Sequence, residues 1–291
     1  MSMRDDAGRL RNDDGRFARD LRPGYDGVPL RQPLTAHFFA ESKTDDAAYI
    51  ALDDLSSVLA GHPEARIIGG HMVSLITTAY PTPGLTPRRT GDADAGIPVE
   101  LASSGALHDA LLDLGYDAES GNRYVRPTGT KDDPAPTIDL LTESLTGRFG
   151  DQKFGGRAFN IMPGMHLATS SGITVNVNAT LTDDSALRST VTVPTVEAAV
   201  VLKSYAWQDR PGIHKDAADL HNLFQVLDHH GADAVGGWQL NQPGNIGARR
   251  DAAANLHLLA DRLETRRSRP DDGFDRRALT ALIRQYVVAP E

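Results

Sequence analysis

The chain has 291 residues, more than one average domain but within the reach of a single large one, so we expect a main domain with an accessory part. Its 30 basic and 39 acidic residues give a net charge of −9, which argues against a protein that coats nucleic acid by bulk electrostatics. The absence of cysteine excludes disulfides, thiolate zinc sites and a cysteine nucleophile. Oxygen and imidazole groups remain as strong metal ligands, and they suit hard cations such as Mg²⁺.

Membrane and export signals are missing from the sequence pattern. No apolar run approaches the roughly 18 residues of a membrane-spanning helix, and the first residues lack the apolar segment of a secretory signal. We therefore expect a cytoplasmic protein with no membrane partner.

The N-terminal third alternates between polar and patterned stretches. Residues 1–33 are charged and interrupted by glycine and proline, which predicts a polar arm outside the core. Apolar residues recur at helical spacing over 44–61 and predict an amphipathic helix. Residues 65–68 then predict a short strand, and Gly69-Gly70 leads into a second helix that ends before Pro81.

The rest of the chain changes character near residue 194. Before it, the pattern predicts a helix over 104–114 and strands over 124–126, 137–141, 174–180 and 189–193. After it, four successive amphipathic segments predict helices. The sequence therefore predicts a sheet-containing part over 34–194 and a helical part over 195–291.

Two glycines stand at the predicted strand-to-helix turn. Gly69 and Gly70 let the backbone approach a ligand, and the N–H groups at the start of the next helix attract an anion such as phosphate. Taken alone, the glycine pair is weak evidence for a ligand, and a tight turn without one is the alternative.

Asp92 and Asp94 are separated by one small residue in the stretch RRTGDADAG. On a strand they project to one face, where they repel unless solvent, a neighbouring arginine or a divalent cation compensates. Asp139 lies inside the apolar run PTIDLLT, and a carboxylate on a buried strand needs a reason. On adjacent strands these three carboxylates can hold one or two Mg²⁺ ions, whereas a polar turn is the alternative for the Asp-x-Asp pair alone.

The first predicted helix after residue 194 carries two cations on one face. Lys203, Trp207 and Arg210 lie at i, i+4 and i+7, so an ammonium and a guanidinium come together and can grip a triphosphate. A solvated helix face with a core tryptophan is the alternative. Lys215 and Asp219 are also four residues apart and can form an ordinary surface ion pair.

These residues together resemble the polymerase-β type of nucleotidyltransferase. Ile68-Gly69-Gly70, then Arg89-Thr90 with Asp92 and Asp94, then Asp139 are similar to that family's glycine turn, Asp-x-Asp pair and third acidic strand residue. The R-x-T-x-D-x-D form is similar to the AbiEii and MenT group of toxin-type enzymes. The segments KSYA, Arg210 and KDAADL resemble a further motif of that group, and the match covers residues 65–225.

The resemblance implies an α+β (α/β) fold: a nucleotidyltransferase core with a mixed β-sheet flanked by helices, then a C-terminal helical domain. It implies a Mg²⁺- or Mn²⁺-dependent enzyme that moves an NMP from an NTP to an acceptor hydroxyl, on an RNA or tRNA 3′ end or on a protein. As the toxin component of a toxin–antitoxin system, it would have a cognate antitoxin as its partner. A small-molecule adenylyltransferase of the antibiotic-modifying kind and a non-catalytic nucleotide-binding protein of the same fold are the alternatives.

The resemblance also implies roles for individual residues. The metal ligands would be Asp92, Asp94 and Asp139, the last of which could instead accept the acceptor's proton. The nucleotide would contact Gly69, Gly70, His71, Arg89, Thr90, Lys203 and Arg210, with Lys203 also counted as catalytic. Asp216 or Asp219 would orient the two cations of the helix.

Two positions depart from the family pattern. His71 stands where a small hydroxyl residue often contacts phosphate, so its phosphate-binding role is the weakest part of the resemblance. Ala95-Gly96 follows the aspartate pair where a bulkier apolar residue is usual, which predicts a short or bulged strand end.

Overall fold

The computed structural model describes residues 3–4, 10–11, 34–85, 87–130, 133–210, 214–265 and 273–289. The chain divides into two units, Met1–Gln32 and Pro33–Glu291. In the first unit, strands β1 (Met3–Arg4) and β2 (Leu10–Arg11) pair antiparallel. The predicted polar arm over 1–33 otherwise lies outside the described residues.

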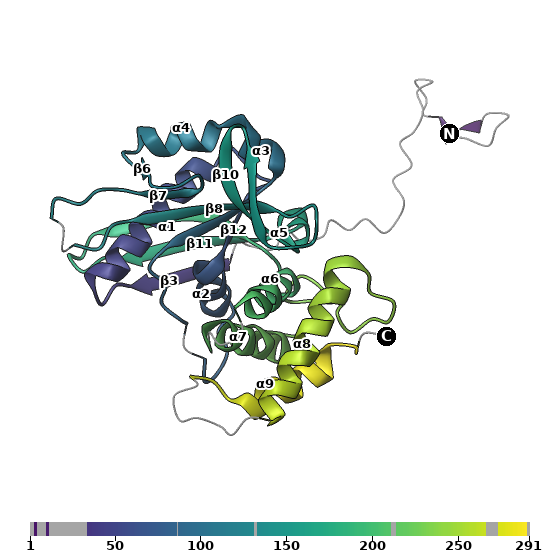
Figure 1. Ribbon diagram of the computed structural model, residues 1–291. Coiled ribbons are helices and arrows are strands. Elements are labelled where there is room, and N and C mark those ends of the chain that lie inside the picture. The colour runs from purple at the N-terminus through teal and green to yellow at the C-terminus, as the bar shows by residue number, and fades with distance from the viewer. Residues whose placement is uncertain are drawn as a thin grey trace. The chain divides into compact units, whose positions relative to one another are not determined.

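The second unit contains both strands and helices (Figure 1). Its strands are β3 (Leu34–Phe39), β4 (Arg66–Ile68), β5 (Ala93–Ile97), β6 (Asp117–Ala118), β7 (Arg123–Val125), β8 (Thr137–Glu143), β9 (Gly150–Phe154), β10 (Arg157–Met162), β11 (Ile173–Thr180) and β12 (Ala186–Val193). Its helices are α1 (Lys43–Leu59), α2 (Gly69–Ala79), α3 (Val99–Ser104), α4 (Ala106–Asp113), α5 (Met165–Ser170), α6 (Val196–Asp209), α7 (His214–His230), α8 (Gly247–Thr265) and α9 (Arg276–Tyr286).

The larger sheet is mixed. Its strands run in the order β4-β5-β8-β10-β9, and β7 pairs with the first part of β8 and with β6. Strand β5 is antiparallel to β4 and parallel to β8, while β8 is also parallel to β10. Because β5 and β8 point the same way in the centre of the sheet, they bring matching positions of two distant segments side by side.

A second sheet has the order β12-β11-β3, with β11 antiparallel to β12 and parallel to β3. Helix α1 contacts both sheets, through β12 on one and through β5 and β8 on the other. Ser42 caps the start of α1: its side chain accepts a hydrogen bond from the Asp45 N–H, which satisfies one free donor of the first turn.

Helices dominate the chain after β12. Helix α6 is buried from Val196 to Trp207, because α5 and α2 lie against it as well as α7 and α8. Helices α8 and α9 pack on each other and on α6 and α7, and they form the outer part of the helical layer (Figure 1). The mixed sheet, the flanking helices and the C-terminal helices confirm the predicted fold class.

Several local predictions were wrong or incomplete. The helix predicted over 104–114 is α4, which spans residues 106–113, and the short helix α3 before it was not predicted. Gly105, in a left-handed conformation with φ of 80°, separates the two helices. Ala95 and Gly96 are not a bulge: both pair in register with β4 and β8. A Cβ on Gly96 would lie 2.4 Å from Met165 Sδ, so the glycine leaves room for that side chain. Strands β3, β9 and β10 and helix α5 were not predicted.

Candidate active site

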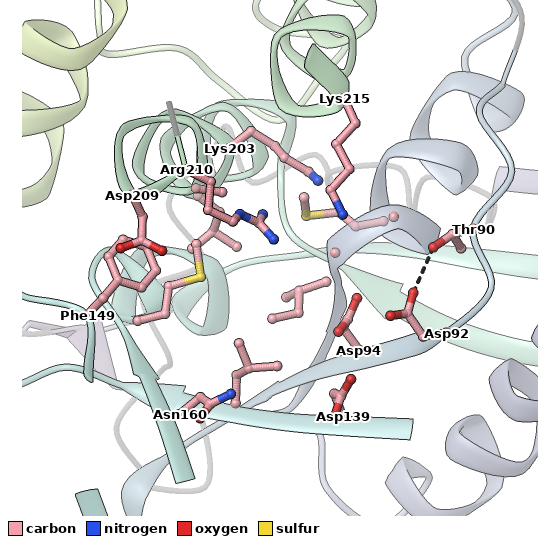
Figure 2. A pocket seen from close by; sticks show the side chains of 18 of the residues that line it. Thr90, Asp92, Asp94, Asp139, Phe149, Asn160, Lys203, Asp209, Arg210 and Lys215 are labelled. Carbon is pink, nitrogen blue, oxygen red and sulfur yellow. Dashed lines mark hydrogen bonds between the residues drawn. The ribbon is translucent and has the colours of Figure 1, made fainter. Parts of the chain in front are cut away.

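Three carboxylates meet at the centre of the mixed sheet. Asp92 immediately precedes β5, Asp94 lies in β5, and Asp139 of β8 is the register partner of Asp94. Oxygen atoms of the three side chains all lie within 4.8 Å of one another, and each side chain is partly exposed (Figure 2). The parallel pairing of β5 with β8 therefore brings together residues that are 45 positions apart in sequence.

The environment of these carboxylates opposes their negative charge. Burial, with Asp92 and Asp139 nearby, raises the pKa of Asp94 from its usual 3.8 to about 7. Burial also raises the pKa of Asp139, although Arg123 Nη1 donates a hydrogen bond of 2.7 Å to Asp139 Oδ2 and acts in the opposite direction. Asp92 accepts a hydrogen bond of 2.9 Å from Thr90 Oγ1.

The donor set fits a hard divalent cation. It consists of carboxylate oxygens alone, close enough together to share one ion, and their mutual repulsion is what a cation would relieve. Among the described residues this is the one group of acidic or histidine side chains with that spacing.

The two glycines leave room for this cluster. Gly69 has φ of 66°, and a Cβ on it would lie 1.8 Å from Asp94 Oδ2. A Cβ on Gly70 would lie 2.4 Å from Thr90 Oγ1. Helix α2 begins at Gly69, so its first N–H groups open beside the carboxylates.

Cationic side chains face the carboxylates from the helical layer. In Figure 2 the ends of Lys203 on α6 and Lys215 on α7 lie above Asp94. Arg210 comes directly after α6, and its guanidinium lies on the side of Lys203 away from Lys215. Both lysines act electrostatically on Asp94, since each lowers its pKa against the effect of burial. Asp92, Asp94 and Asp139, here called the acidic floor, therefore lie opposite a group of cations, here called the basic roof, which consists of Lys203, Arg210, Lys215 and Arg88.

Two buried carboxylates hold this roof in place. Asp219 contacts Lys203 Nζ at 2.6 Å and receives two hydrogen bonds from Arg88, of 2.8 Å from Nε and 3.1 Å from Nη2. Asp216 contacts Lys203 at 3.4 Å and Arg210 at 3.1 Å. Both aspartates are fully buried. Burial raises the pKa of Asp219, but Lys203 and Arg88 more than offset that effect, so the pKa lies below its usual value.

The roof has four cations, Arg88, Lys203, Arg210 and Lys215, and the two buried carboxylates Asp216 and Asp219 bind three of them. Lys215 is exposed and has no ion pair among the described residues, while Lys203, Arg88 and Arg210 share Asp216 and Asp219. The roof therefore keeps a net positive charge, which suits a polyanionic ligand.

Floor and roof enclose one cavity of about 440 Å³, within the size range of small-molecule sites. Eight of the predicted contact and metal residues line it: Gly69, Gly70, Thr90, Asp92, Asp94, Asp139, Lys203 and Arg210. Asp216 and Asp219 lie behind the roof, as residues that orient its cations would.

Two predicted nucleotide contacts lie elsewhere. Arg89 does not line the cavity, and its guanidinium binds Glu41 at 2.6 Å and also Asp45. His71 is 1% exposed and is absent from the lining. Burial lowers its pKa from 6.5 to about 4, so it is a neutral side chain near neutral pH and offers no cation to a phosphate.

Sequence reasoning missed Arg88 and Lys215 as cavity residues. The signal for Arg88 was present, because the spacing R-x-T-x-D-x-D counted back from Asp94 and Asp92 ends on Arg88 and not on Arg89. Lys215 had been assigned only to an ion pair with Asp219, whereas Asp219 binds Lys203 and Arg88 instead. Phe149, Asn160 and Asp209 also line the cavity, and no motif marks them.

No protein-family model matches the chain, and no curated protein matches it. The chain is similar to a crystal structure of an antigenic nucleotidyltransferase-like protein from Paracoccidioides brasiliensis. The two are 13% identical, the match covers 86% of this chain and 96% of the other, and the TM-score is 0.41. A likeness of that size assigns no activity, which has to come from the site itself.

Within the described ranges, no helix is both long enough and apolar enough to cross a lipid bilayer.

Proposed function

We propose that this protein is a metal-dependent nucleotidyltransferase, which transfers an NMP group from an NTP to an acceptor hydroxyl and releases pyrophosphate. The observation that carries the proposal is the placement of Asp92, Asp94 and Asp139 across one cavity from a roof with net positive charge. A triphosphate substrate needs both the carboxylates and the cationic roof, because its α-phosphate reacts at the first while its outer phosphates are held by the second.

Asp92, Asp94 and Asp139 are the residues that would hold Mg²⁺ or Mn²⁺. When bound there, the cation would supply charge neutralisation to the reacting phosphate and lower the pKa of an attacking hydroxyl. Thr90 would fix the Asp92 carboxylate through its 2.9 Å hydrogen bond, and Arg123 would fix that of Asp139.

The roof would bind the outer phosphates. Lys203 and Lys215 would act as point charges and Arg210 as a fork, while Asp216 and Asp219 restrict where Lys203 and Arg210 can go. The first N–H groups of α2, next to Gly69 and Gly70, would donate to a phosphate oxygen from the opposite side. This arrangement would align the α-phosphate over the carboxylates, with the pyrophosphate leaving toward the basic roof.

The motif resemblance extends the proposal to the toxin-type branch, with an RNA or tRNA 3′ end or a protein hydroxyl as acceptor. Arg88, Thr90, Asp92 and Asp94 occupy the R-x-T-x-D-x-D spacing of that branch, and Lys203 through Leu220 match its second motif. A cognate antitoxin is part of this finer proposal.

The enzymatic test uses each α-³²P-labelled NTP with Mg²⁺ or Mn²⁺ and either total tRNA or a panel of hydroxylated small molecules. We expect covalent label on tRNA with the wild type and none with the double variant Asp92→Ala/Asp94→Ala. Label on a small molecule would support the adenylyltransferase alternative. Equal labelling of every acceptor by the wild type and the double variant, with no Mn²⁺ binding by either protein, would refute the proposed enzymatic activity.

Expression in a bacterial host tests the toxin-type branch separately. We expect growth arrest on induction of the wild type and normal growth with Asp92→Ala/Asp94→Ala at equal protein level. Equal growth of both strains, together with activity in vitro, would remove the toxin role and leave the transferase.

A further inference from the structure

A second cavity, of about 340 Å³, shares no lining residue with the catalytic one. Its walls come from four segments: the end of β8 with the loop after it, the connection from β10 into α5, Tyr205 of α6, and the start of α8 with the residue before it. The two cavities are neighbours, because Ala206 next to Tyr205 lines the catalytic one. The volume of the second cavity suits a small molecule, and the proposed function uses none of its residues.

One wall of the second cavity presents an arginine that is held from behind. The buried Glu197 accepts a hydrogen bond of 2.8 Å from Arg249 Nε through one oxygen, and its other oxygen accepts from the N–H groups of Gln239 and Leu240. The two Nη nitrogens of Arg249 donate no hydrogen bond within the described part of the chain, and the side chain is 29% exposed. A fixed guanidinium with both outer nitrogens free can bind a carboxylate or a phosphate through two parallel hydrogen bonds.

The acidic residues of the same cavity decide between those two anions. Glu143 ends β8, is partly exposed, and makes one ion-pair contact among the described residues, with His166 at 3.9 Å. Asp251 also lines the cavity, but Tyr205 donates to it at 3.2 Å and Arg250 contacts it at 3.1 Å. Glu143 is therefore available to a cation, and its charge disfavours a phosphate group, which carries about two negative charges near neutral pH.

We propose that the second cavity binds a free apolar α-amino acid. The carboxylate of the amino acid binds the outer nitrogens of Arg249, and its ammonium group binds Glu143. Such a ligand matches the cavity because it carries both charges on one carbon atom and has no net charge. Four apolar side chains line the cavity beside these polar groups and receive the side chain of the ligand: Pro163, Met165, Leu167 and Ile246.

The exposure of Ile246 supports an apolar ligand side chain. Ile246 is 82% exposed, although it is a large apolar residue, and it directly precedes α8 at the edge of this cavity. Contact with an apolar ligand removes part of this surface from water. The inference does not depend on the proposed function, because no residue of the acidic floor or the basic roof lines this cavity.

Isothermal titration calorimetry with the common amino acids, and with derivatives that lack one charge, tests the inference. We expect at least one of leucine, isoleucine, methionine and phenylalanine to bind. Its N-acetyl derivative lacks the ammonium group and its amide lacks the carboxylate. Each derivative should bind about tenfold or more weakly than the free amino acid, the size expected when a hydrogen bond to a charged group is lost.

Variants assign the two ends of the ligand. Arg249→Lys keeps a positive charge near Glu197 but removes the fork, so it should weaken binding of the amino acid about tenfold. Glu143→Gln should weaken the amino acid about tenfold and change the affinity for its N-acetyl derivative little. Arg277→Lys and Glu100→Gln are matched changes at exposed positions outside the cavity, and both should bind as the wild type does.

Thermal melts show first whether each variant is folded. If Arg249→Lys unfolds for lack of its contact with Glu197, the partly exposed Glu143→Gln still tests the site. No detectable binding of any common amino acid would overturn the inference, as would equal affinity for the amino acid and its N-acetyl derivative. Tighter binding of inorganic phosphate than of every amino acid would overturn it in favour of a simple anion site.

Binding that neither Arg249→Lys nor Glu143→Gln changes would place the amino acid elsewhere and would also overturn the assignment. None of these outcomes bears on the transferase, which is tested through Asp92 and Asp94.

Discussion

At the scale of single residues, the site brings together charges that are costly to bury. Three carboxylates crowd the floor, and the roof includes the buried Lys203, with the buried Asp216 and Asp219 behind it. The roof charges compensate one another through short contacts, whereas the floor charges repel. Stability is therefore expected to depend on pH through the floor and on ion pairing through the roof.

Asp94→Asn should change how stability depends on pH. The folded-state pKa of Asp94 is raised from 3.8 to about 7, so over that interval the folded protein keeps a proton that the unfolded chain has released. Its stabilising contribution is full below the unfolded pKa and is lost as pH rises through about 7. In EDTA, thermal melts from about pH 5 to about pH 8 should show Asp94→Asn gaining stability relative to wild type as pH rises.

The control for that experiment is Asp113→Asn, which should follow the wild type at every pH. A difference between Asp94→Asn and wild type that stays constant across the range would contradict the raised pKa.

Asp219→Ala should lower the free energy of unfolding by about 3–5 kcal/mol, because it leaves Lys203 and Arg88 without their buried partner. Urea denaturation of wild type and variant gives the value directly. The exposed Asp113→Asn should stay within about 0.5 kcal/mol of wild type. A loss below about 1 kcal/mol for Asp219→Ala would mean that solvent replaces the contacts.

At the scale of elements, the turn from β4 into α2 sets the position of Asp94. Gly69 combines a positive φ with the closest approach that a Cβ would make to that carboxylate. Gly105, between α3 and α4, also has a positive φ, but a Cβ there would meet nothing within 4 Å. Alanine substitutions at Gly69 and Gly105 therefore distinguish the effect of backbone strain from the effect of displacing the Asp94 carboxylate.

Gly69→Ala should therefore abolish Mn²⁺ binding, whereas Gly105→Ala should only reduce stability by about 1 kcal/mol through backbone strain. Calorimetric titration with Mn²⁺ measures the first effect and thermal melting the second. Unchanged Mn²⁺ affinity in a folded Gly69→Ala would show that Asp94 can move without consequence.

At the scale of the whole molecule, the core belongs to one of the two units. The buried apolar residues that pack together in the described structure lie between Ala36 and Val287, within Pro33–Glu291. The predicted boundary at residue 194 within that unit stays a prediction. Helix α6, which follows this boundary, is buried by α2 and α5 as well as by the later helices.

A fragment that begins at Pro33 should consequently unfold at the same urea concentration as the full chain and bind NTP with the same affinity. The buried apolar residues that pack together in the described part of the chain all lie within this fragment. A clear fall in the unfolding midpoint of the fragment would contradict this, and a fall in affinity alone would assign the first 32 residues a role in binding.

The sequence by itself determined the order of the elements that carry the site. Glycine turns, strand alternation and helical spacing are local patterns, so they predicted β4, α2, β8, the later helices and the aspartates as a group. Strands β9 and β10 were missed, and Phe149 and Asn160 with them, because their residues follow no clear alternation or motif.

Only the tertiary structure decided which side chains meet. The parallel register of β5 and β8 places Asp94 beside Asp139, and the packing of α7 gives Asp219 to Arg88 and Lys203. Arg88 and Arg89 are chemically identical neighbours, yet one enters the cavity and the other turns to Glu41 and Asp45. The two side chains take different directions because each binds a carboxylate more than 40 positions away along the chain. A local sequence pattern contains no information about such distant partners.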